Sequence, residues 1–167
     1  MIPFHTVFPE LAQREVRCVH VGPRQGGSPT ANDLPADEYP FMEFYCEDLN
    51  CDCRRVFLQV IAKGQPGKIF ASIGYGWESE RFYRRKMPWA PDGVRGTMRG
   101  ELDPFNEQSE FAAEFLDLFQ KVLLDEPYRL RLRRHYRMFR EELARRAAAD
   151  KSAQKPSLPV VGRKVKS

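Results

Sequence analysis

The stretch that decides the fold is residues 40–75, PFMEFYCEDLNCDCRRVFLQVIAKGQPGKIFASIGY. It contains three segments, 40–46, 54–63 and 68–75, that are rich in the aromatic and β-branched residues favoured in strands. The sequence GQPG at 64–67 is typical of a turn between two strands. We therefore predict three consecutive antiparallel strands, with the cysteine-rich segment connecting the first two.

A fourth strand is predicted ahead of this stretch. Residues 15–21, EVRCVHV, alternate as a half-buried strand does, which places Val16, Cys18 and His20 on one face. Residues 22–38 are rich in Gly, Pro, Ser, Asn and Asp, a composition typical of a long loop. The four strands together predict an antiparallel meander.

Two helices are predicted after the sheet. Residues 77–104 contain several prolines and glycines and are expected to be irregular. Asn106 is a candidate cap for a helix that ends near Leu124, and Asp125 with Pro127 is the start pattern of a last helix. Each helix has an apolar stripe, so we expect a C-terminal helical hairpin over the sheet. The stripes are Phe111, Phe115, Leu118, Phe119 and Val122 in the first helix, and Tyr128, Leu132, Tyr136, Phe139 and Leu143 in the second.

The bulk composition is that of a small α+β protein. With 167 residues, 42% hydrophobic and 30% charged, the chain has the size and balance of one globular domain, predicted at 1–149. Residues 150–167 are rich in Lys, Ser and Pro and are predicted to be a disordered basic tail. No apolar run is long enough for a membrane span and the start lacks a secretory signal pattern, so we expect a cytoplasmic protein without a membrane partner.

Three cysteines lie close together in the connection, in the pattern Cys46-x4-Cys51-x-Cys53. In an extended segment Cys51 and Cys53 point to the same side, and Cys46 approaches from the end of the partner strand. Cysteines of a protein that is not secreted are reduced, and clustered thiolates are preferred zinc ligands. The pattern therefore predicts a zinc site.

A tetrahedral zinc site needs a fourth ligand, for which we expect Cys18, with His20 as the alternative on the same strand face. Four protein ligands leave no position for water or substrate, so such a site is structural. Three alternatives stay open: reduced thiols without a metal, a redox disulfide between Cys46 and Cys53, and an iron–sulfur cluster on the same thiols.

The stretch from Leu34 to Val60, which contains the segment Tyr-Cys-x4-Cys-x-Cys-Arg-Arg at residues 45–55, resembles a family of uncharacterised bacterial proteins that carry this segment. Some of these proteins end in a short cysteine-rich metal-binding module, whereas the end of this chain, VVGRKVKS at 160–167, has no cysteine. The resemblance covers about a sixth of the chain. It implies metal binding and no particular reaction.

The charge is divided unevenly along the chain. Residues 127–167 hold 13 Lys and Arg against 3 Asp and Glu, whereas the rest holds 14 against 20. A stripe of arginines beside the apolar stripe of the last helix suits contact with nucleic acid, a ribosome or an acidic protein. The alternative is that acidic residues of the preceding helix region pair with it. The stripe is Arg129, Arg133, Arg137 and Arg140, and the acidic residues are Glu101, Asp103, Glu107, Glu110, Glu114 and Asp117.

The sequence favours no enzyme class. It contains no phosphate loop, dinucleotide fingerprint or nucleophile-elbow motif. His135 lies among arginines, where packing or solvent exposure is expected, and Glu43 is expected near a wet hairpin tip, unsuited to acid–base catalysis. We therefore predict a metal-binding, non-enzymatic interaction module. The alternatives are a nucleic-acid- or ribosome-associated protein and a zinc- or thiol-dependent enzyme.

Overall fold

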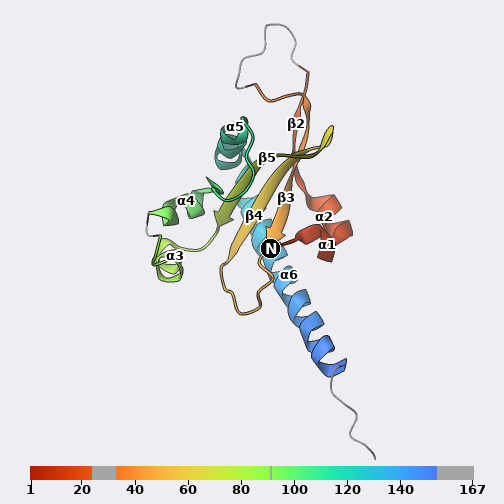
Figure 1. Cartoon of the computed structure of the whole chain (residues 1–167), viewed down its shortest axis with the longest axis vertical. Helices are drawn as coiled ribbons and strands as arrows, with labels where there is room; N and C mark the ends of the chain where they lie inside the picture. Colours follow the sequence, from red (N-terminus) through yellow and green to blue (C-terminus); the bar gives the residue numbers. More distant parts are fainter. Residues whose placement is uncertain (24–32, 91, 154–167) are drawn as a thin grey trace, which may run out of the picture.

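The protein is an α+β fold built on a six-stranded antiparallel sheet, as a computed structural model shows (Figure 1). The structure describes residues 1–23, 33–90 and 92–153. The elements in chain order are β1 (Ile2–Pro3), α1 (Phe4–Val7), α2 (Pro9–Glu15), β2 (Arg17–Val21), β3 (Asp37–Tyr45), β4 (Arg55–Ala62), β5 (Gln65–Gly76), α3 (Glu80–Lys86), α4 (Gly93–Arg99), β6 (Glu101–Leu102), α5 (Ala112–Leu118), the π-helical turn η1 (Phe119–Leu123) and α6 (Glu126–Ala153).

The predicted meander is confirmed. β2, β3, β4 and β5 pair antiparallel in chain order. Two short strands extend the sheet, because β1 pairs with the end of β3 and β6 pairs with β5. Each spans two residues, which is too short to show a sequence period. The edge of β3 is therefore shared, with β2 beside its first half and β1 beside its end.

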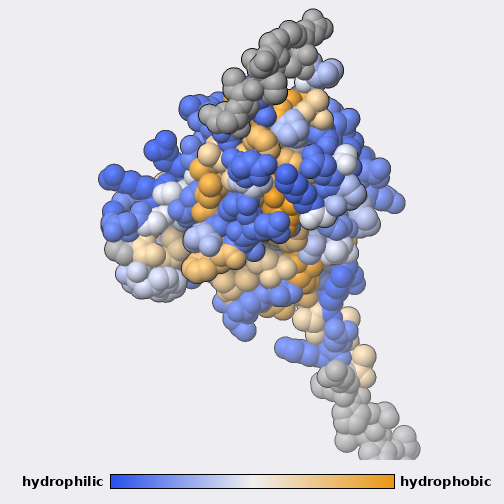
Figure 2. All heavy atoms as spheres, turned by 45° about the horizontal axis from the view of Figure 1, so that its top comes forward, coloured by the Kyte–Doolittle hydropathy of each residue, from blue (hydrophilic) through white to orange (hydrophobic). Residues whose placement is uncertain are grey.

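The hydrophobic core lies between the sheet and the helices α5 and α6. Val56 and Leu58 alternate inward on β4 and are at most 1% exposed. Phe115 of α5 packs against the ring of Tyr39, with centroids 4.8 Å apart, and Phe139 of α6 is fully buried in the same cluster. Figure 2 shows hydrophobic surface between hydrophilic side chains over the middle of the body.

Residues 77–104 were expected to be irregular, but they contain the two helices α3 and α4. Ser79 caps α3 by accepting a hydrogen bond from the backbone N–H of Phe82. Phe82, Tyr83 and Val94 are buried together in a small second hydrophobic cluster, apart from the main core. Both helices have seven residues, fewer than the length at which an apolar stripe becomes recognisable.

The first predicted helix begins later than expected. α5 starts at Ala112, and the Asn106 side chain donates to Asp103 Oδ1 at 2.9 Å and caps no helix. The helix then widens into the π-helical turn η1. Such a turn rotates the following side chains relative to an α-helix, and Val122, predicted to be buried, is 61% exposed.

The predicted start of the last helix is confirmed. The Asp125 carboxylate accepts a hydrogen bond from the backbone N–H of Tyr128 at 2.8 Å. α6 runs for 28 residues to Ala153 and so includes the first residues of the predicted tail, while residues 154–167 lie outside the described part. Among the described residues, no helix has both the length and the apolar character needed to cross a membrane.

Candidate metal centre

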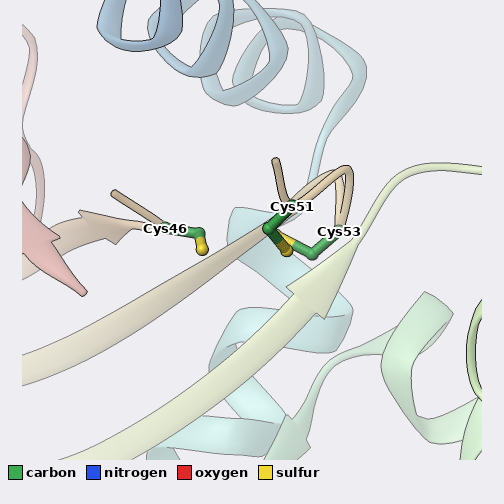
Figure 3. A group of neighbouring side chains, drawn as sticks. All are labelled: Cys46, Cys51 and Cys53. Carbon is green, nitrogen blue, oxygen red and sulfur yellow. The ribbon is translucent and has the colours of Figure 1, made fainter. Parts of the chain in front are cut away.

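The structure brings the three clustered cysteines together. Cys46 directly follows β3, and Cys51 and Cys53 lie in the connection to β4. Their Sγ atoms all lie within 4.8 Å of one another, and Figure 3 shows the side chains gathered at the end of the strand pair. Tetrahedral zinc, with bonds of about 2.3 Å to sulfur, places its sulfur ligands about 3.8 Å apart. A small contraction of the group therefore suffices to hold a metal ion.

A tight turn brings Cys51 back toward Cys46. The Asp48 carboxylate accepts a hydrogen bond from the backbone N–H of Asn50 at 2.8 Å, and the Asp48 carbonyl accepts one from Cys51 at 3.0 Å. The backbone of Arg54 then has a φ of +48°, a left-handed conformation that residues other than glycine rarely adopt. The connection is thus shaped by its own backbone so that the thiols share one side.

The last helix holds this connection in place. The Arg140 guanidinium donates to the carbonyl oxygens of Asp48 and Leu49, the latter at 2.7 Å. Arg54 is paired within the connection with Asp52 at 2.8 Å and reaches Glu78 at 3.3 Å. An arginine predicted to contact nucleic acid, Arg140, is therefore already hydrogen-bonded beside the thiols.

The structure does not bring the predicted fourth ligands to the thiols. Cys18 lies opposite Pro40 in the β2–β3 pair, six residues along β3 from Cys46. At about 3.4 Å per residue this separation is about 20 Å. His20 lies opposite Glu38, still farther away, and its Nδ1 is 3.5 Å from the Glu38 carboxylate. The physical reason is the register, because β2 pairs with the start of β3 whereas the thiols follow its end.

The thiols instead border a small hollow of ≈ 180 Å³, whose lining includes Glu101 and Asp103. Among the described residues, no further Cys, His, Asp or Glu has a ligand atom within 4.8 Å of all three sulfur atoms. Arg55 also lines the hollow and places a positive charge beside the thiols. The chain therefore supplies three ligands, and the fourth coordination position of a bound metal ion would face this hollow.

The arginine stripe of α6 stands apart from the acidic residues expected to pair with it. Two of those acidic side chains form ion pairs with lysines instead. Asp117 pairs with Lys121 at 2.6 Å, and Glu110 pairs with Lys68 at 3.7 Å. The side chains of three stripe residues are exposed and form no hydrogen bond or ion pair with another described residue. These residues are Arg129, Arg133 and Arg137.

Two of these arginines line a groove of ≈ 680 Å³ between α6 and the thiol-bearing connection. Trp77 and Tyr136 lie in the same lining, with ring centroids 5.3 Å apart and an edge-on orientation. Cys51 lines both this groove and the smaller hollow. The cysteine cluster thus forms part of the wall of a groove that contains aromatic rings, four arginines and three acidic side chains.

The prediction for Glu43 was wrong, since the residue is buried in the fold at 7% exposure. Its Oε2 atom lies 2.7 Å from Nδ1 of His135, which is 1% exposed. Two sequence signals point to this pair. Glu43 alternates with Phe41 and Tyr45 on the inward face of β3, and His135 falls in the apolar stripe of α6.

Comparison of the chain with family models, with curated proteins and with solved structures gave no match. The resemblance of residues 34–60 to a bacterial family therefore stays a prediction.

Proposed function

We propose that the protein binds one zinc ion through the thiolates of Cys46, Cys51 and Cys53, with a water molecule or a carboxylate of the adjoining hollow as the fourth ligand. The observation that carries the proposal is the convergence of the three Sγ atoms within 4.8 Å. Sulfur-rich sites of this kind select zinc over magnesium or calcium, which prefer oxygen ligands. An iron–sulfur cluster uses four cysteine ligands, and only three thiols gather in the described part of the chain.

We propose a structural role for this zinc ion. Residues 46–54 connect the two central strands without regular secondary structure, and zinc would fix the connection by joining its two ends. A catalytic site also keeps an open position on the metal, but it needs room for a substrate. The hollow of ≈ 180 Å³ is smaller than the roughly 300–1,000 Å³ of typical ligand pockets, which favours the structural role over an enzyme.

Metal analysis of purified variants tests the proposal. Cys51→Ser removes one of the three clustered thiols, and we expect the zinc content to fall from about one ion per chain to near zero. Cys18→Ser removes a cysteine outside the group and serves as the matched control, with zinc retained. Equal zinc loss in both variants, or full retention in Cys51→Ser, contradicts the proposed ligand set.

A second function, binding of single-stranded nucleic acid, is favoured by the groove beside α6. The unpaired guanidinium groups of Arg133 and Arg137 line this concave surface, where they can contact phosphates. Trp77 and Tyr136 supply rings on which bases can stack. We propose this groove as the nucleic-acid contact of the interaction module, with zinc stabilising one of its walls.

A further inference from the structure

A third cavity lies beside β3, where the edge of the sheet is incomplete. β2 pairs with β3 up to Phe41 and β1 pairs from Phe44 onward, so neither strand pairs with Met42 or Glu43. The helices α1 and α2 bridge this gap, and a cavity of ≈ 330 Å³ remains beneath them. Its apolar lining consists largely of Phe4, Pro9, Ala12, Val16, Pro40 and Met42.

Polar groups from three elements, of which those of β3 and α6 are buried and that of α2 is partly exposed, meet at this cavity. The Glu43 Oε2 atom accepts a hydrogen bond from the Tyr45 hydroxyl at 2.8 Å and from Nδ1 of His135 at 2.7 Å. The other ring nitrogen of His135, Nε2, lies 3.1 Å from the carboxylate of Glu15. Phe4 stacks on the imidazole at 4.3 Å and fixes its plane. Glu43, His135 and Glu15 all line the cavity.

One atom of this network has no partner in the described part of the chain. Both hydrogen bonds to the Glu43 carboxylate fall on Oε2, and none falls on Oε1. The Glu43 side chain is 5% exposed and lines the cavity, and Oε1 is not among the fully buried polar atoms without a partner, so this oxygen remains open to the cavity. This oxygen is therefore an acceptor without a protein donor, to which the N–H group of a ligand in the cavity could donate a hydrogen bond.

We propose that this cavity binds a small amine, with its apolar body beneath α1 and α2 and its ammonium group donating to Oε1 of Glu43. An apolar pocket with a few convergent polar groups is the usual form of a small-molecule site. The site is independent of the zinc-binding thiols, none of which lines it.

The charges around the cavity favour a cation over an anion. Glu15 and Glu43 are two carboxylates of its lining, against one imidazole that is shared between them. Arg131 and Arg134 pair with Glu15 but do not line the cavity. His5, the remaining titratable lining residue, is exposed. An anionic head group placed at Oε1 would meet a like charge, whereas an ammonium group would complete a charged hydrogen bond.

Titration of the full zinc-loaded chain with benzylamine, benzyl alcohol and benzoate, followed by NMR, tests the proposal. We expect saturable shifts at α1, α2 and β3 with benzylamine, weaker binding of the alcohol and none of benzoate. Glu43→Gln should weaken benzylamine binding by about tenfold or more, since the charged hydrogen bond is lost. Glu10→Gln removes an exposed carboxylate of the same helix α2 outside the cavity and should leave binding unchanged.

A variant that keeps Glu43 separates binding from folding. Ala12→Leu places added side-chain volume at the cavity wall, and we expect it to abolish benzylamine binding while the protein still melts cooperatively. If Glu43→Gln fails to fold, this variant decides the question. The proposal is overturned by absence of saturable benzylamine binding, by equal affinity for the alcohol, by equal weakening in Glu10→Gln, or by undiminished binding in Ala12→Leu.

Discussion

Nδ1 of His135 lies 2.7 Å from Oε2 of Glu43, although 92 residues separate them in the chain. The contact joins the last helix to the central strand β3, and both side chains are almost completely buried. The second ring nitrogen of His135 meets Glu15 at the end of α2, so one imidazole ties three elements together. Because removal of one partner leaves a buried polar group unpaired, this network is expected to stabilise the fold strongly.

Stability of the wild type should fall more steeply in acid than stability of Glu15→Gln. Burial raises the pKa of the Glu15 carboxyl, but the His135 hydrogen bond and the charges of Arg134 and Arg131 together outweigh this and hold the pKa below its usual 4.5. The stabilisation is present above the unfolded-state pKa and is lost as pH falls through the lower folded-state pKa. The difference in unfolding free energy between the two proteins should therefore shrink from pH 7 to pH 3.

Urea denaturation at several pH values measures that difference. Glu10→Gln, an exposed change on the same helix, is the control and should follow the wild type. A difference between wild type and Glu15→Gln that stays constant with pH would show that the charge of Glu15 is unimportant.

Arg140→Met should weaken zinc binding without removing a ligand. The guanidinium donates to two carbonyl oxygens of the thiol-bearing connection, so its loss allows the connection to move. Groups that orient metal ligands typically change affinity by roughly 10–100-fold, and we expect about tenfold. Competition with a zinc-binding dye measures the change. Arg137→Met is the matched control on the same helix, and equal weakening in both variants would argue for a general effect of charge.

Removal of zinc should expose the connection to trypsin. In the proposed zinc-bound state the metal would hold residues 46–54 at both ends, and Arg54 is also held by its pairs with Asp52 and Glu78. After chelation, we expect cleavage after Arg54 to accelerate and the melting temperature to fall, since a ligand that binds only the folded state stabilises it. Mass spectrometry of the fragments locates the cut. An unchanged cleavage pattern and melting temperature would remove the structural role while leaving metal binding possible.

Binding of single-stranded RNA should depend on the groove. The double variant Arg133→Glu with Arg137→Glu should lose salt-sensitive retention on immobilised poly(U), because two unpaired groove charges are reversed. Arg81→Glu with Arg85→Glu makes the same change in net charge on α3, outside the groove, and should retain most binding. Equal losses in the two variants would indicate only non-specific attraction to a basic protein.

The parts of the fold that the sequence predicts are those set by local residues. The strands within 40–75 follow from their composition, and Asp125 caps α6 through a contact three residues away. By contrast, α3 depends on distant contacts, such as the hydrogen bond from the Tyr83 hydroxyl to the Arg54 carbonyl at 2.7 Å. Short helices held in this way leave little trace in hydrophobic periodicity.

The candidate sites also differ in whether nearby or distant residues determine them. Cys46, Cys51 and Cys53 are close in sequence, so their convergence was predictable from one hairpin. The position of Cys18 depends on which half of β3 its strand pairs with, and alternation along a strand does not carry that information. Glu43 and His135 are recognisable as buried only when the inward face of β3 and the apolar stripe of α6 are considered together.

X-ray absorption at the zinc edge of the purified wild-type protein tests the central claim most directly, because it counts the sulfur atoms bound to the metal. We predict three sulfur ligands at about 2.3 Å and one lighter oxygen or nitrogen ligand. A spectrum with four sulfur ligands would require a thiol from outside the group, and a spectrum with only oxygen and nitrogen ligands would contradict metal binding by the three cysteines.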